Sequence, residues 1–351
     1  MTDKKNAFDL LRLILATSVL ITHGLLLGGY KLTDPLAWLS KNQTSFSEFG
    51  VMGFFALSGY LITASFERTK GVFTFLSHRF LRIFPGFWVC LAVTAFLFAP
   101  LIYCLKGRPP GNFDFFGKDG SASYFINNLF LKMKQWNIRD VLQYSSYQGS
   151  LNGSLWSLFP EMQCYCLTIV AGIAGLFNKN RTLYLIFSIT LFAFFAINFN
   201  FSQSFGPTLI TLSPALELYV SYIAGSLVYV FRDQLILDKK GTIFLFFFTL
   251  MLLKFGGYNL VSPLLIAFTL INVFGLFEYR LRYDLSYGIY IYGFPVQQLL
   301  FMLFGSRLPA PLFILLSLLA AATLGFLSYV LVEKPFINLR KKTDLILNRF
   351  T

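Results

Sequence analysis

The sequence predicts an all-α, polytopic integral membrane protein with about ten transmembrane helices and both termini in the cytoplasm. Three observations predict this class. The 351 residues are 56% hydrophobic and only 13% charged, whereas soluble domains carry about 25% charged residues. Apolar stretches long enough to cross a bilayer, which takes about 20 residues, recur along the whole chain. The basic residues are concentrated on one side of the topology that these stretches define.

Ten stretches qualify as spans, and together they predict a single transmembrane domain over residues 1–351. They are residues 8–29, 49–66, 83–104, 154–177, 182–201, 212–231, 241–255, 258–277, 285–305 and 310–332. The first is expected to be a retained helix, because no A-x-A-like cleavage site follows it. The stretch 241–255 is the weakest, since it is short and only GGY separates it from the next span.

The distribution of Lys and Arg supports this topology. With the N-terminus inside, 19 of the 29 basic residues fall in inner segments, and six of the other ten lie in one long outer loop, 105–150. This is the positive-inside pattern of membrane proteins. The net charge of +13 therefore reports on topology, and no nucleic-acid partner is expected. Membrane lipid is the expected surrounding.

The outer loop 105–150 is too polar to span a membrane and is rich in Gly, Asn and aromatic residues. Loops of this length are often functional, and aromatic side chains here are suited to stacking on sugar rings. The alternative is a partly interfacial connector. Cys164 and Cys166 form a C-x-C without a further His or Cys set, so no metal site is expected.

Arg12 and His23 lie in the same apolar stretch, "RLILATSVLITH". Their spacing brings both side chains to one helix face, about 20° apart around the axis and about 16 Å apart along it. A charged side chain at the bilayer centre costs roughly 2.5–3.5 kcal/mol, so this placement calls for a reason. Arg12 near the inner end can reach the interface by snorkelling. His23 is deeper, where the alternatives are acid–base chemistry and a packing hydrogen bond.

A second polar group lies in "SLWSLFPEMQCY", where Glu161 enters the first turns of a helix that starts on the outer side. A His23–Glu161 pair would form an acid–base unit in which the carboxylate holds the imidazole tautomer. A purely structural ion pair is the alternative. Trp156 is expected in an aromatic belt or in a pocket wall.

Two arginines, Arg79 and Arg82, share a helix face at the inner membrane edge. Such a pair suits bidentate phosphate binding, and the alternative is ordinary positive-inside charge. In "FFALSGY", Ser58 and Gly59 are small enough to permit close helix contact.

These motifs, in this order, resemble the membrane-bound acyltransferase 3 family, which includes bacterial O-antigen and exopolysaccharide acetylases. The family patterns are R-x10-H, F-F-x-x-S-G-[FY], R-x-x-R-I-x-P, W-[ST]-L-x-x-E, S-Y-x-x-Y and V-E-K-P. They match Arg12 and His23; Phe54, Phe55, Ser58, Gly59 and Tyr60; Arg79, Arg82, Ile83 and Pro85; Trp156, Ser157, Leu158 and Glu161; Ser286, Tyr287 and Tyr290; and Val332 to Pro335. One position departs, because Gly293 stands where the family often has the His of a His-x-Pro.

The resemblance implies an enzyme of the bacterial cytoplasmic (inner) membrane that transfers an acyl group, usually acetyl, from cytosolic acyl-CoA to a sugar hydroxyl of a cell-surface glycan or its lipid-linked precursor. Acetyl-CoA would be the co-substrate. The implied site residues fall into three groups: His23 as base with Glu161 orienting it; Arg12, Arg79, Arg82 and Ser58 at the donor; and Trp156 and Tyr287 at the acceptor. An acyl-histidine intermediate is a second possible mechanism.

Two functions from other classes also fit intramembrane Arg, His and Glu. A transporter or flippase for a glycan or lipid would use them as a relay, although no internal repeat of the transporter kind is visible. A non-catalytic assembly protein would tolerate loss of His23.

Overall fold

The structure is a computed structural model that describes residues 6–69, 71–205 and 215–339, and within these ranges every regular element is a helix. The chain divides into two compact units, each built from three stretches. The first comprises Met1–Leu15, Asp34–Val72 and Pro160–Tyr283, and the second comprises Ala16–Thr33, Phe73–Phe159 and Asp284–Thr351. Helix α1 (Phe8–Leu27) contributes residues to both units.

Within the residues that the structure describes, seven helices are long and apolar enough to cross a membrane. They are Phe8–Leu27, Phe46–Arg68, Val72–Cys104, Arg181–Phe199, Tyr258–Gly275, Ser286–Arg307 and Ala310–Asn338. Three predicted spans correspond instead to shorter helices of 16, 16 and 17 residues, which are α7 (Leu158–Ile173), α10 (Ala215–Val230) and α12 (Lys239–Phe255). The all-α, multi-pass class is therefore confirmed, while the number ten, the cytoplasmic termini and the single domain remain predictions.

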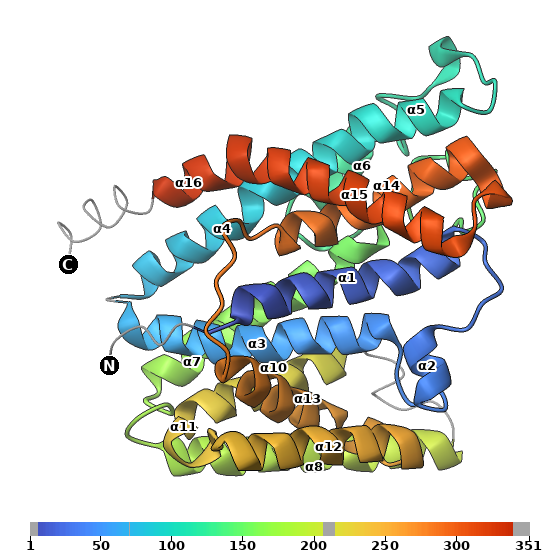
Figure 1. Cartoon of the computed structure of the whole chain (residues 1–351). Coiled ribbons are helices and arrows are strands. Elements are labelled where there is room, and N and C mark those ends of the chain that lie inside the picture. Colours follow the sequence, from blue (N-terminus) through green and yellow to red (C-terminus); the bar gives the residue numbers. More distant parts are fainter. Residues whose placement is uncertain (1–5, 70, 206–214, 340–351) are drawn as a thin grey trace. The chain divides into compact units, whose positions relative to one another are not determined.

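The core of the first unit is the contact between α3 (Phe46–Arg68) and α10 (Figure 1). A Cβ atom at Gly59 would lie 1.9 Å from the carbonyl oxygen of Tyr222, and one at Gly225 would lie 1.8 Å from the carbonyl oxygen of Ala56. Only glycine permits this approach of two helix backbones. The prediction that Gly59 allows close helix contact is confirmed.

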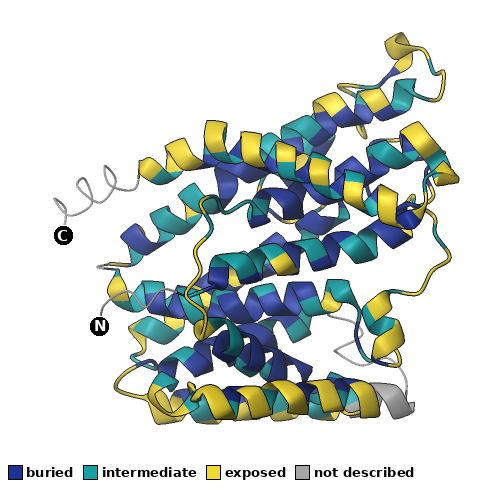
Figure 2. Ribbon diagram, in the orientation of Figure 1, coloured by how far each residue is buried: buried dark blue, intermediate teal, exposed yellow. Residues whose placement is uncertain are grey.

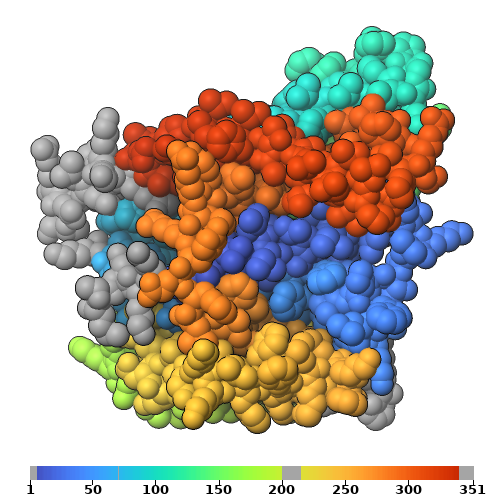
Figure 3. Space-filling view, viewed as in Figure 1, coloured from blue at the N-terminus to red at the C-terminus, as the bar shows by residue number. Residues whose placement is uncertain are grey.

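The surface of the first unit carries apolar side chains on α8 (Arg181–Phe205) and α12. On α12, the side chains of Phe244 and Phe255 are 71% and 79% exposed. Figure 2 shows this helix largely in yellow, the colour of exposed residues, and Figure 3 shows its side chains at the surface of the molecule. The other side of α12 packs on α13 (Tyr258–Gly275). Exposed apolar helix faces of this kind suit contact with lipid.

The second unit is organised around α14 (Ser286–Phe304), which packs along α15 (Ala310–Ser328). A Cβ atom at Gly288 would lie 2.3 Å from the Cα atom of Gly325, so this pair also needs small residues. Helix α4 (Val72–Val93) continues through a π-helical turn, Thr94–Phe98, into α5 (Ala99–Cys104). Short helices in this unit include η4 (Gly305–Arg307), η5 (Tyr329–Glu333) and α16 (Lys334–Asn338), and the first unit contains the short helices α2 (Pro35–Leu39) and α11 (Arg232–Leu235).

The predicted outer loop, 105–150, is a folded part of the second unit. It contains the turn η2 (Pro110–Asn112) and the helix α6 (Ser121–Asn128). The buried Asn128 side chain accepts hydrogen bonds from the N–H groups of Lys134 and Gln135 and donates one to the Gln135 carbonyl. This network fixes the chain just before the segment that reaches the pocket described below.

Candidate active site

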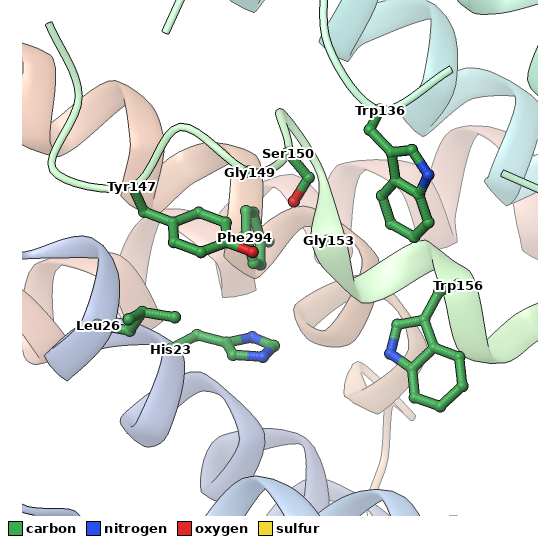
Figure 4. Close-up of a pocket in the computed structure, with 9 residues that line it drawn as sticks. All are labelled: His23, Leu26, Trp136, Tyr147, Gly149, Ser150, Gly153, Trp156 and Phe294. Carbon is green, nitrogen blue, oxygen red and sulfur yellow. The ribbon is translucent and has the colours of Figure 1, made fainter. Parts of the chain in front are cut away.

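A pocket of about 450 Å³ in the second unit contains the imidazole of His23 (Figure 4). Its volume lies in the range of small-molecule sites, roughly 300–1,000 Å³. Aromatic and small polar side chains surround the imidazole, and they come from four segments: α1, the end of the long loop, the turn η3 (Gly153–Ser157) and α14. The principal lining residues are His23, Trp136, Tyr147, Ser150, Trp156 and Phe294.

The His23 ring is held by packing against α14. It meets the ring of Phe294 edge to face, with 5.1 Å between centroids and 75° between planes, a favoured aromatic geometry. Tyr147 contacts Phe294 from the loop, with ring centroids 6.0 Å apart. In the described part of the chain, no side chain donates a hydrogen bond to the imidazole or accepts one from it. Both ring nitrogens are thus available to a bound molecule.

Pro295 breaks the hydrogen-bond ladder of α14 directly behind Phe294. Proline has no N–H, so the carbonyl of Ile291 loses its helical partner. The Asn152 side chain donates to that carbonyl at 2.9 Å, and the Cys90 thiol donates to it at 3.3 Å. A helix break inside a membrane protein is tolerated where neighbouring groups restore such bonds, and here the restoring bond also ties η3 to α14.

Trp156 reaches the pocket because η3 is fastened to α14. The Ser157 and Tyr290 hydroxyl groups lie 2.6 Å apart in a buried hydrogen bond. Of the two positions predicted for Trp156, the structure shows the pocket wall, and Figure 4 draws it among the lining residues together with His23. Its role toward an acceptor remains a prediction.

Gly293 also belongs to this part of α14, and the space beside it is filled. A Cβ atom at Gly293 would lie 3.3 Å from Cδ1 of Leu20 on α1. A histidine at this position, which the family pattern given above would place here, would require Leu20 to move. The imidazole in this pocket therefore comes from α1.

The structure places Tyr287 away from this pocket. Its hydroxyl donates to the carbonyl of Ile83 at 2.8 Å, and its ring would lie 3.0 Å from a Cβ atom at Gly86. Both partners are on α4, close in sequence to Arg82. The structure thus groups Tyr287 with a predicted donor residue and not with Trp156.

Arg82 forms two ion pairs within the second unit. Its guanidinium donates to Asp284 at 2.8 Å and lies 3.5 Å from the carboxylate of Glu333, which is 1% exposed. Asp284 in turn accepts from the hydroxyl and N–H of Ser286. The R-x-x-R, S-Y-x-x-Y and V-E-K-P patterns therefore meet at one charge cluster. Neither carboxylate was expected from the sequence, although Glu333 lies in the V-E-K-P motif and Asp284 lies two residues before the S-Y-x-x-Y motif.

The other predicted arginines have different surroundings. The Arg79 guanidinium lies 5.7 Å from the ring centroid of Phe75. Arg12 belongs to the first unit, where it pairs with Asp9 at 3.5 Å and both side chains are about one-third exposed. This geometry suits an arginine that reaches toward an interface.

Glu161 also belongs to the first unit, at the start of α7. Its carboxylate accepts a short hydrogen bond of 2.5 Å from the hydroxyl of Tyr165, one turn later. The Ser58 hydroxyl donates to the same carboxylate oxygen at 3.5 Å, a long hydrogen bond. Ser58, predicted at the donor, thus contacts Glu161, and Tyr165 is a partner that sequence reasoning missed. The His23–Glu161 pair remains a prediction.

The pocket residues that were not singled out from the sequence include Trp136, Tyr147 and Ser150. These three lie in the outer loop, whose aromatic richness was noticed. A loop without periodicity gives no register from which to choose among its aromatic residues, so only the tertiary contacts identify these three.

The fold and the site together define a multi-pass membrane protein that presents a histidine in an aromatic pocket. The chain matches the family model described as "Acyltransferase domain" over residues 5–330, and it belongs to this family. It is an acyltransferase, and this membership favours the enzyme over the transporter and assembly alternatives.

Two curated proteins are similar over nearly their whole lengths. One, named "O-acetyl transferase", from Shigella phage Sf6, is 30% identical over 95% of this chain and 97% of its own. Another, named "Nodulation protein 10", from Rhizobium leguminosarum bv. viciae, is 26% identical over 99% of this chain and 96% of its own. No solved structure matches the chain significantly.

Proposed function

We propose that this membrane O-acyltransferase moves an acetyl group from acetyl-CoA to a sugar hydroxyl of a cell-surface glycan or its lipid-linked precursor, at the bacterial cytoplasmic membrane. The observation that carries the proposal is the imidazole of His23 in a pocket with Trp136, Tyr147 and Trp156. Indole and phenol rings offer flat apolar faces on which a sugar ring stacks, and a nearby imidazole meets its hydroxyls. The similar phage protein named "O-acetyl transferase" supports acetyl as the group transferred.

In the proposed reaction, His23 accepts the proton of the sugar hydroxyl through an unprotonated ring nitrogen. The sugar oxygen then forms a bond to the thioester carbonyl carbon, and the carbon–sulfur bond breaks. The departing thiolate takes a proton, which returns the imidazole to its neutral state. Such general-base catalysis contributes about 10²–10⁴-fold to rate. Glu161 is the proposed orienting carboxylate, and Tyr165 fixes its position.

Arg12, Arg79 and Arg82 are the proposed phosphate-binding groups for the donor. Arginine suits this task because its planar fork of N–H groups matches phosphate oxygens. Asp284 and Glu333 pair with Arg82 and would orient its guanidinium for the phosphate, and Arg79 lies one turn away on the same helix.

Transfer is tested with purified protein, acetyl-CoA labelled in the acetyl group, and methyl glucoside, galactoside, mannoside and rhamnoside as acceptor probes. Label on a glycoside, lost in the His23→Ala variant, is the expected result. Release of free CoA without labelled sugar in every case would contradict the glycan acceptor. Comparison of surface glycans by mass spectrometry, with and without the protein, extends the test to the cell.

The same label separates direct transfer from an acyl-histidine intermediate. Protein incubated with labelled acetyl-CoA in the absence of acceptor is quenched and digested. Label on the peptide that contains His23 indicates the covalent route, whereas unlabelled protein that still acetylates the glycoside indicates direct transfer.

A further inference from the structure

The end of the long loop forms one wall of the His23 pocket. Tyr147, Gly149 and Ser150 line the pocket there, yet residues 145–152 form neither a helix nor a strand. Without a hydrogen-bond ladder of its own, the position of this wall depends on contacts that other elements provide.

Gln298, on α14, supplies three of those contacts from a fully buried position. Asn137 adds a hydrogen bond to the Gln148 carbonyl, and the Ser146 hydroxyl donates to the Leu27 carbonyl. The side-chain amide of Gln298 donates to the carbonyls of Tyr147 and Ser150, at 3.0 and 2.9 Å. Its carbonyl oxygen accepts from the hydroxyl of Ser145 at 2.5 Å. The Gln298 side chain, which is 0% exposed, therefore binds the segment 145–150 at both ends and near its centre.

The neighbouring Gln297 performs the corresponding task on the opposite wall. Its amide donates to the carbonyl of Leu20 at 2.8 Å, one turn of α1 before His23, and it is also 0% exposed. Two consecutive glutamines of α14 thus fasten the helix that carries the imidazole and the loop that faces it. The pair provides a matched variant and control.

A buried side chain whose donors and acceptor are all paired fixes the position of the backbone that it binds, because any displacement leaves those groups unpaired. We propose that Gln298 is a positioning residue for the acceptor: it sets the 145–150 wall at the distance from His23 that the acceptor sugar requires. The proposal rests on the proposed function, which places the acceptor in this pocket. Gln298 itself does not touch the reacting atoms.

The first test is independent of catalysis. Amide hydrogen exchange is measured on the intact protein in lipid nanodiscs, for wild type, Gln298→Met and Gln297→Met. Methionine keeps the length and removes the hydrogen bonds. Exchange in peptides covering residues 145–151 is expected to rise about tenfold in Gln298→Met and to stay unchanged in Gln297→Met. Equal exchange in all three proteins would overturn the proposal.

Ser145→Ala serves if Gln298→Met does not fold. It removes the hydroxyl that donates to Gln298 and that also accepts a long hydrogen bond of 3.4 Å from the N–H of Tyr147, so the Tyr147 amide is left out of the comparison. This variant is expected to raise exchange in the same peptides by a smaller factor. Unchanged exchange in this variant would likewise count against Gln298 as the anchor.

The second test is kinetic, with acetyl-CoA and whichever of the four methyl glycosides the wild-type protein acetylates fastest. Gln298→Met is expected to raise KM for the glycoside about tenfold and to leave KM for acetyl-CoA unchanged. A merely structural role would lower the amount of active protein and leave both KM values as they were, which would overturn the proposal. If wild type acetylates no glycoside, the proposed function fails, and hydrogen exchange still decides the role of Gln298.

Discussion

The hydroxyl groups of Ser157 and Tyr290 share a buried hydrogen bond of 2.6 Å. This bond joins the W-[ST]-L-x-x-E pattern to the S-Y-x-x-Y pattern, and with the Asn152–Ile291 bond it fastens η3 to α14. Trp156 and Phe294 are thereby held around one pocket with His23. Motifs that are far apart in the sequence are thus parts of one packing arrangement.

The close contact of α3 and α10 predicts which glycines the fold requires. Gly59→Ala would place a methyl group 1.9 Å from the Tyr222 carbonyl oxygen, so the two helices must separate. We expect this variant to lose most folded protein in detergent, measured by size-exclusion chromatography and thermal melting. Gly275→Ala, where a Cβ atom has nothing within 4 Å, is the control and should behave as wild type. Equal melting of both variants would show that the contact is looser than described.

The Arg82 cluster predicts a rescue. Arg82→Ala leaves the buried Glu333 carboxylate without its cation, which for buried pairs costs about 3–5 kcal/mol. Arg82→Ala should therefore melt at a clearly lower temperature, and adding Glu333→Gln should recover much of the loss. If Arg82 also serves the donor, the double variant keeps a raised KM for acetyl-CoA although it is folded. If Arg82→Ala is as stable as the wild-type protein, the ion pair between Arg82 and Glu333 does not stabilise the fold.

The contact between Tyr165 and Glu161 predicts a role for a residue that no motif contains. Tyr165→Phe removes the 2.5 Å hydrogen bond and keeps the ring, so the carboxylate is expected to lose its fixed orientation. Turnover should fall by about ten- to a hundredfold, in keeping with a hydrogen bond to a charged group, and Glu161→Gln should lower it further. Thermal melting of both variants checks that the protein remains folded. Full activity of both would exclude Glu161 from the reaction.

The topology predicts which loops face outward. Phe116, 88% exposed in the long loop, should lie outside, and Asn178, exposed between α7 and α8, should lie inside. With Cys104 and Cys166 replaced by serine, a membrane-impermeant maleimide added to intact cells should label Phe116→Cys and not Asn178→Cys. Permeabilised cells should label both. The reverse pattern in intact cells would contradict the orientation inferred from the basic residues.

The sequence predicts the helices well because a bilayer imposes length and hydropathy on each span. It is less informative for α7, α10 and α12, where helices of 16 or 17 residues fall short of the usual span length. Arg12, His23 and Trp156 were identifiable because polar or aromatic groups stand out in apolar surroundings. The sequence did not indicate which of these residues share a pocket, because that depends on contacts between segments far apart in the chain.

The partners of these residues illustrate the same limit. Glu333 and Asp284 pair with Arg82 across long sequence separations, and no local pattern links an arginine of α4 to a carboxylate of η5. Tyr147 and Ser150 lie in a loop without periodicity, and the buried amide of Gln298 binds their backbone carbonyls across more than 140 residues of sequence. Tyr287 matched a motif, but the structure turns its hydroxyl to the Ile83 carbonyl.

The central claim is that His23 performs the chemistry, and the most direct measurement is the turnover of His23→Ala beside that of His78→Ala. Acetyl transfer from labelled acetyl-CoA to the best methyl glycoside is measured for both, with thermal melting as the check on folding. His23→Ala should lower kcat by about 10²–10⁴-fold, the contribution of a general base, while His78→Ala remains close to wild type. A folded His23→Ala that loses less than about tenfold, or a His78→Ala variant that is inactive in its place, would contradict the account.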